Sequence, residues 1–179
     1  MQSTLLSFLG QKEVYPTVFY MKNYNIQFIN KIPNESKFLG KIKWKYSSND
    51  LSIFIDNKNH NTDIYNFNND YTTNNISLLK SQLQKSIRRK LSDLSVNIAY
   101  QMINLSFNDF IRRLPIITLE DVILNQYYPI LIWMMVAYST GKWTPNKNDI
   151  LWLLSYVKYL CNIDFRENYS KIDFHTPIC

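Results

Sequence analysis

The spacing of apolar residues changes once along this chain of 179 residues, near residue 76. Before that point, short runs of β-branched and aromatic residues are separated by polar breaks, which is typical of strands. After it, Leu79, Leu83 and Ile87 recur at the four-residue spacing of one helix face, with Ile76 and Leu78 assigned to the same face. The sequence therefore predicts an α+β protein, with a small β-rich N-terminal part followed by an all-α helical bundle.

The first part is expected to hold four short strands. They are predicted at residues 14–20, 25–30, 39–46 and 51–56. The polar residues 47–50 are typical of a turn, so the last two strands should form a hairpin. Residues 57–75 are rich in Asn, Asp, Thr and Tyr without periodicity, which predicts a long loop with one edge strand at 63–67.

The second part is expected to hold several short helices. They are predicted at residues 77–90, 94–104, 106–112, from 119 onward, 129–139 and 148–161. Pro115 should stop the third helix, because proline lacks the backbone donor that a helix interior uses. Thr118 should cap the fourth, placing Glu120 and Asp121 in a first turn where acids suit the helix dipole. The last two helices are apolar nearly all round, which favours the centre of a bundle or an oligomer interface.

These patterns define an expected domain organisation. It comprises a peptide at 1–12, a β-rich region with the Asn-rich loop at 13–74, a helical domain at 75–162 and a tail at 163–179. The formal net charge of +6 permits contact with nucleic acid without requiring it. Two cysteines, Cys161 and Cys179, give no disulfide framework, so a reducing intracellular compartment is expected. The longest apolar run, 127–138, is too short to span a bilayer, so no membrane association is expected.

The N-terminus carries a short motif in which Gln2 is followed by Leu5, Phe8 and Leu9. One helical turn would place the two leucines and the phenylalanine on a single face. The motif resembles the PIP box, the peptide by which replication and repair proteins bind the sliding clamp PCNA. The resemblance implies a PCNA-type clamp as partner, with these four residues as the clamp-binding residues. The alternative is a short amphipathic helix that packs on its own domain.

Two segments of the helical half also resemble one family. The first is the sequence SQLQKSIRR at 81–89, and the second is the Arg-Arg pair at 112–113 followed by Glu-Asp-Val at 120–122. They are similar to the C-terminal helical region of replication-associated AAA+ ATPases of the RarA/MgsA and Werner-helicase-interacting type. The resemblance implies a collar-like domain for docking or for assembly into a homo-oligomer. The chain has no Gly-x-x-x-x-Gly-Lys-Ser/Thr loop, so neither a nucleotide nor another cofactor is expected.

The densest basic cluster comprises Lys85, Arg88, Arg89 and Lys90. On a helix the first three share one side, and such a face can contact DNA phosphates with low sequence specificity. The alternative is a solvated helix face whose terminal cations suit the helix dipole. We therefore assign these four residues as candidate nucleic-acid-binding residues.

The pair Arg112-Arg113 stands beside a predicted turn, and its expected role is structural. Arg112 or Arg113 is expected to pair with Glu120 or Asp121 and to hold two helices together.

Residues with catalytic or metal-binding chemistry are sparse and poorly spaced. His60 and His175 stand apart in polar segments, and no paired Cys or His spacing predicts a metal site. No catalytic residue is assigned. The hypothesis is a non-enzymatic DNA replication or repair accessory protein, located in the nucleus or at a site of DNA replication. The alternative is a structural or protein-interaction protein, such as a viral one, that is unrelated to replication.

Overall fold

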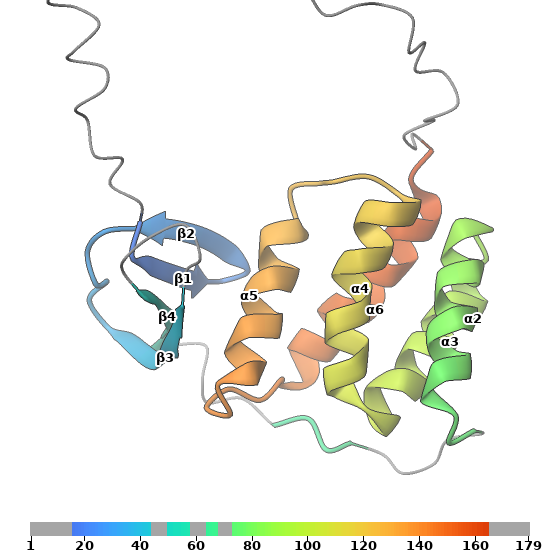
Figure 1. Cartoon of the computed structure of the whole chain (residues 1–179), viewed down its shortest axis with the longest axis horizontal. Coiled ribbons are helices and arrows are strands. Elements are labelled where there is room, and N and C mark those ends of the chain that lie inside the picture. Colours follow the sequence, from blue (N-terminus) through green and yellow to red (C-terminus); the bar gives the residue numbers. More distant parts are fainter. Residues whose placement is uncertain (1–15, 44–49, 58–63, 68–72, 165–179) are drawn as a thin grey trace, which may run out of the picture. The chain divides into compact units, whose positions relative to one another are not determined.

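The computed structural model describes residues 16–43, 50–57, 64–67 and 73–164, and within them it shows a four-stranded sheet followed by five helices (Figure 1). The strands are β1 (Val18–Lys22), β2 (Asn25–Ile29), β3 (Ser36–Lys43) and β4 (Asp50–Asp56). The helices are α2 (Ile76–Arg88), α3 (Ser92–Leu105), α4 (Phe107–Asp121), α5 (Tyr128–Ser139) and α6 (Lys147–Asn162). The predicted α+β class is confirmed. The chain divides into two compact units, at 1–60 and 61–179.

The sheet of the first unit has the strand order β2-β1-β4-β3. The central pair, β1 and β4, is parallel, while β2 and β3 pair antiparallel with their neighbours. The predicted pairing of β3 with β4 is therefore confirmed. Asn23 and Tyr24 join β1 to β2 with φ angles of 49° and 55°, as a two-residue turn that matches the twist of a hairpin requires.

Burial in the sheet is greatest on β1. Its residues Val18 to Met21 are all buried, so both faces of this central strand are covered. On one face Val18, Tyr20 and Phe54 form a core cluster, and on the other Phe19 stacks on Phe28 with ring centroids 4.4 Å apart. A continuous apolar run is the expected sequence for a strand that is buried on both faces.

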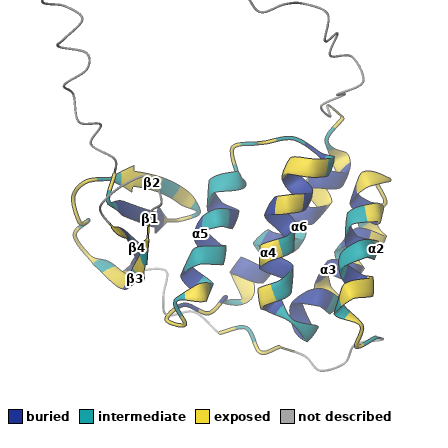
Figure 2. Cartoon of the chain, viewed as in Figure 1, coloured by how far each residue is buried: buried dark blue, intermediate teal, exposed yellow. Residues whose placement is uncertain are grey.

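The helical unit is built from neighbouring helix pairs. α2 packs on α3 and α4, α3 packs on α6, and α4 packs on α5 (Figure 1). Figure 2 shows the buried residues on the inward sides of these helices. α5 and α6 lie within one residue of their predicted bounds, and Gly141 follows α5 with a φ of 70°, where glycine is favoured. None of the helices in the described part of the chain combines the length and apolar character needed to cross a lipid bilayer.

The helix expected to stop before Pro115 continues through it, which corrects two predictions. α4 starts after Ser106, whose side chain accepts a hydrogen bond from the Asp109 amide, and it runs on to Asp121. Thr118 does not cap a further helix, because it is buried within α4 and its hydroxyl donates to the carbonyl of Leu114 at 3.0 Å. A proline inside a helix costs about 3 kcal/mol. Burial of the apolar residues around it offsets that cost; they are Phe110, Ile111, Leu114 and Ile117.

The segment before α2 makes less regular structure than predicted. Instead of an edge strand at 63–67, the described residues contain a single bridge between Ile64 and Asn146. The Tyr65 amide donates to the carbonyl of Pro145 at 3.1 Å, and its hydroxyl donates to Asn104 Oδ1 at 3.0 Å. The segment is therefore held to the helical unit by individual bonds instead of a strand ladder.

Candidate functional site

α2 carries the candidate site because its three faces meet three different surroundings. The core face holds the buried residues Leu79, Leu83 and Ile87, as predicted. The face towards α4 holds the residues that bond to it, Lys80, Gln84 and Arg88. The face towards α3 holds residues that line a groove, Leu78, Gln82, Lys85 and Arg89.

The α2–α4 face is a strip of polar contacts. Asp121 accepts hydrogen bonds from Arg88 Nε and from Gln84 Nε2, both at 2.7 Å. Gln84 also donates to Glu120 and accepts from Arg113. Because α4 is continuous, Glu120 and Asp121 lie in its last turn and not in a first turn as predicted. There the helix dipole is unfavourable for acids, and donors from α2 compensate.

The predicted pairing of Arg112 or Arg113 with Glu120 or Asp121 is corrected by the same finding. Residues seven to nine apart on one helix are about 10–14 Å apart along its axis, which is too far for an ion pair. Asp121 is instead paired with Arg88 across the helix interface.

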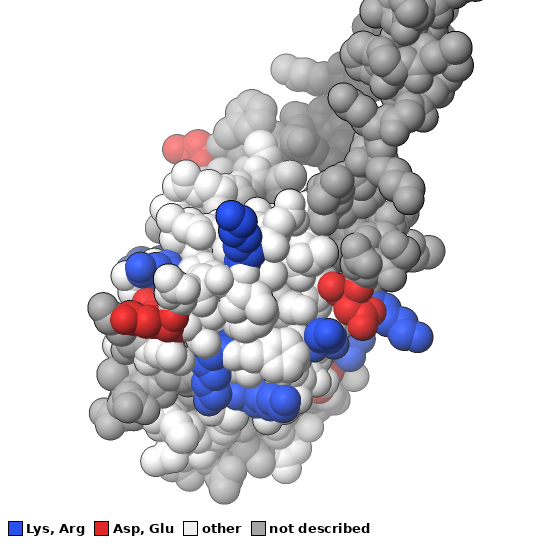
Figure 3. All heavy atoms as spheres, turned by 90° about the vertical axis from the view of Figure 1, so that its left-hand side faces the viewer, with Lys and Arg blue, Asp and Glu red and all other residues white. Residues whose placement is uncertain are grey.

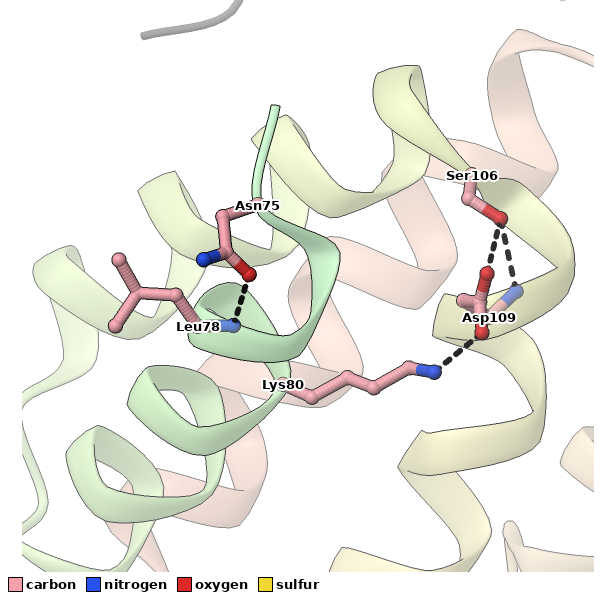
Figure 4. Close-up of polar contacts among 5 residues, drawn as sticks. All are labelled: Asn75, Leu78, Lys80, Ser106 and Asp109. Carbon is pink, nitrogen blue, oxygen red and sulfur yellow. Dashed lines mark hydrogen bonds and ion pairs between the residues drawn. The ribbon is translucent and has the colours of Figure 1, made fainter. Parts of the chain in front are cut away.

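A second polar contact anchors the start of α4 to α2 (Figure 4). Lys80 of α2 forms an ion pair with Asp109, which also accepts a hydrogen bond from Ser106 Oγ at 2.6 Å. The hydrogen bond from Lys80, followed by that from Ser106, lowers the pKa of the Asp109 carboxyl below its ordinary value. At the start of α2, Asn75 Oδ1 accepts from the Leu78 amide at 3.0 Å (Figure 4). The Lys80–Asp109 contact holds α2 against α4, whereas the Asn75 bond caps the start of α2. The face of α2 that borders α3 remains open.

The open face borders a groove between α2 and α3, with a volume of about 450 Å³. Its lining comprises Thr73, Leu78, Gln82, Lys85, Ser86, Arg89, Leu91, Leu94, Ile98 and Gln101. Three leucines stay exposed along it: Leu78 by 45%, Leu91 by 44% and Leu94 by 50%. Leu78 was predicted to share the buried stripe of α2, and this is wrong because that stripe begins at Leu79, one residue and a hundred degrees further round the helix.

Sequence reasoning missed the groove as a site. The signal that could have found it is a second helical spacing along α2 and its C-cap, offset from the buried stripe: Leu78, Gln82, Lys85 and Arg89. On the other side the exposed leucines Leu91 and Leu94 stand at the start of α3, three residues apart. Helical spacing identifies such a row, but only the neighbouring helices show that it stays open.

The four predicted nucleic-acid-binding residues do not share one surface. Lys85 and Arg89 border the groove, whereas Arg88 is turned to Asp121 on α4. Lys90 lies in the turn after α2 with a φ of 60°, and its Nζ is 3.1 Å from Asp164 Oδ1. Figure 3 shows the side that lies on the left in Figure 1, where the sheet is drawn, and not the groove of α2 and α3. Basic side chains on that side form small separate groups, with acidic side chains beside two of them. The described surface on that side is not the continuous basic stripe that is typical of a nucleic-acid interface.

A smaller hollow of about 220 Å³ lies on α6 and the loop before α5. Its aromatic walls are Tyr127, Trp152, Tyr156 and Tyr159. Trp152 and Tyr156 are stacked with centroids 5.5 Å apart. Burial raises the pKa of the Tyr156 phenol, whose oxygen accepts a hydrogen bond from Asn125 Nδ2 at 3.0 Å. The rings pack on one another, and no charged residue lines the hollow. These aromatic contacts join α6 to the loop between α4 and α5.

The sequence predicts no metal site, and the described part of the chain can be compared with that expectation. Among the described residues, no group of three or more His, Cys, Asp or Glu side chains is placed to hold a metal ion. The clamp-binding motif lies outside the described residues, and so do both histidines and most of the predicted tail. The motif comprises Gln2, Leu5, Phe8 and Leu9.

Comparison of the chain with protein-family models, with curated proteins and with solved structures finds no match. A functional proposal therefore rests on the motif and on the surfaces of α2 and α3.

Proposed function

We propose that this protein is a non-enzymatic accessory protein of DNA replication or repair that works by binding other proteins. The observation that carries the proposal is the spacing of Gln2, Leu5, Phe8 and Leu9. In one helical turn the three apolar residues form a plug for a hydrophobic pocket, which is the helix-in-groove mode of recognition. The Gln2 amide offers a donor and an acceptor that can fix the peptide's entry into that pocket. The proposed partner is a PCNA-type sliding clamp, because the peptide resembles the peptides that bind such clamps.

Isothermal titration calorimetry of the full chain with a PCNA-type clamp tests this proposal. Phe8→Ala should weaken binding by at least about tenfold, because the loss of a buried aromatic anchor commonly costs over 1.4 kcal/mol. Ser7→Ala is the matched control, since position 7 is a spacer in the motif and should leave the affinity unchanged. Equal affinity of the wild-type and Phe8→Ala proteins, or no binding by either, would show that the motif is not a clamp ligand.

The helical unit is proposed as a second docking or self-association element. This part of the proposal is supported by the resemblance of residues 81–89 and 112–122 to a collar domain, and by the exposed leucines of the α2–α3 groove. A contact with DNA would use Lys85 and Arg89 above all, because Arg88 and Lys90 already face Asp121 and Asp164.

The second candidate function is that of a protein-interaction module unrelated to replication. The groove favours this candidate, because exposed apolar residues with a polar border mark binding surfaces whether or not a clamp is involved. If the protein does not bind the clamp but its groove still binds another protein, this candidate is favoured over the first.

A further inference from the structure

We propose that the α2–α3 groove binds an acidic amphipathic helix of a partner protein. This inference concerns a site separate from the N-terminal motif, so it holds or fails independently of clamp binding. It rests on the apolar floor, the charge and the shape of the groove.

The floor of the groove offers apolar surface to a ligand. Three leucines expose between 44% and 50% of their surface: Leu78, Leu91 and Leu94. Other leucines of the same helix pair, such as Leu79 and Leu83, are exposed by 1% or less. Ile98 also lines the groove and is buried. Three half-exposed leucines around one cleft gain from being covered, because removal of apolar surface from water is favourable.

The charge of the groove selects an acidic ligand. Lys85 and Arg89 are exposed on its α2 side, one helical turn apart. The lining contains no acidic residue, and within the described part of the chain no carboxylate lies within ion-pair distance of either cation. The other lining polar groups are uncharged amides and hydroxyls, such as Gln82 and Gln101. A ligand with carboxylates along one edge would therefore meet complementary charge without repulsion.

The shape of the groove favours a helix as the ligand. Only three residues separate Arg88 from Ser92, so α2 and α3 turn back on each other and pack side by side (Figure 1). Residues of both helices and of the turn between them line the groove. A helix laid in such a cleft presents apolar anchors at intervals of three and four residues, and its flanking acids reach the cationic edge. A nucleic-acid backbone fits less well, since its phosphates would lie against leucines and only two cations would be available.

The test uses the full chain and a fluorescein-labelled helical peptide of about 18 residues, or five turns. The peptide carries leucines at helical a and d positions and glutamates along one flank, and a second peptide has lysine in place of every glutamate. Fluorescence anisotropy should show saturable binding of the acidic peptide and binding of the lysine peptide that is at least about tenfold weaker, the factor given by 1.4 kcal/mol. Leu94→Glu should lower the affinity for the acidic peptide at least about tenfold, the loss expected for an interface anchor.

A charge exchange makes the test specific for the groove. The double variant Lys85→Glu/Arg89→Glu should lose the acidic peptide and bind the lysine peptide better than the wild-type protein does. Leu151→Glu on α6 is the matched control, because Leu151 is 61% exposed, does not line the groove and should leave peptide affinity unchanged. Circular dichroism and thermal unfolding of each variant establish that it is folded before its affinity is compared.

Three outcomes would overturn the proposal. The first is equal affinity for the two peptides, or no binding of the acidic peptide up to about 100 µM, which is a hundredfold above a micromolar Kd. The second is salt-sensitive binding of a short DNA duplex that the double variant loses, in the absence of peptide binding, since it would assign the cations to phosphates. The third is a wild-type oligomer in light scattering that Leu94→Glu dissociates, since a second copy of the chain would then cover the groove.

Discussion

Arg88 of α2 and Asp121 of α4 form an ion pair in which the arginine Nη2 lies 2.6 Å from the carboxylate Oδ1. The pair is asymmetric, because the Asp121 side chain is only 4% exposed whereas that of Arg88 is 59% exposed. A nearly buried carboxylate at the carboxyl end of a helix needs a donor, and Arg88 supplies it together with Gln84. Arg88 is therefore part of the α2–α4 interface as well as of the basic sequence cluster.

Arg88→Gln should lower the free energy of unfolding by about 1–2 kcal/mol. Removing one partner of a buried ion pair is strongly destabilising, but the exposure of Arg88 and the remaining bond from Gln84 reduce the loss. Arg89→Gln is the matched control, because Arg89 borders the open groove and should change stability by less than about 0.5 kcal/mol. Urea denaturation followed by circular dichroism measures both. Equal losses in the two variants would contradict the proposed division of the basic cluster.

Pro115→Ala should raise the free energy of unfolding by about 1 kcal/mol. The substitution restores a helical hydrogen bond to the carbonyl of Ile111 and removes a steric clash, worth up to about 3 kcal/mol. It also loses two buried ring carbons, at about 0.8 kcal/mol each.

Pro129→Ala in the first turn of α5 is the matched control for this prediction. Like Pro115→Ala, it increases the conformational entropy of the unfolded chain. It cannot restore a backbone hydrogen bond, because an amide in the first turn of α5 has no partner within the helix. Pro129→Ala should therefore be neutral or destabilising in thermal unfolding. A destabilised Pro115→Ala protein would show that the ring's packing outweighs the missing bond.

Asp109→Asn should make stability less dependent on pH in the acid range. The folded-state pKa of Asp109 is lowered from 3.8, chiefly by the hydrogen bond from Lys80. A lowered pKa gives stability that is present above the unfolded value and is lost as the pH falls through the folded value. The wild-type protein should thus lose this contribution as the pH falls from above the unfolded-state pKa through the lower folded-state pKa, and the variant should lack it throughout.

The size of this effect is expected to be about 1 kcal/mol or less, because Asp109 and Lys80 are each about a third exposed and solvent screens the pair. Urea denaturation at neutral and acid pH measures it. Asp93→Asn, in the exposed first turn of α3, is the control for the change in net charge. If the two variants show the same pH dependence, the contact of Asp109 with Lys80 does not contribute to stability.

The sequence by itself determined the four strands of the sheet and most of the helices, although not the absence of an edge strand at 63–67 or the continuity of α4. The four-residue spacing of Leu79, Leu83 and Ile87 places them on one face of any helix, and the structure buries all three. The bounds of α5 and α6 were also predictable to within one residue. These features depend on backbone geometry and on side-chain periodicity, which neighbours in the chain define without reference to the rest of the fold.

Only the tertiary structure decided how the elements meet and which residues stay accessible. Pro115 is a helix breaker by local rules, yet α4 continues through it because its turns are buried against other helices. The parallel pairing of β1 with β4 and the contact of Arg88 with Asp121 join residues more than thirty positions apart, beyond the range of any local pattern. Leu78 stays exposed because α3 lies beside it without covering it. The physical reason is common to all four: burial and charge pairing depend on contacts between distant segments, and these contacts exist only once the chain has packed.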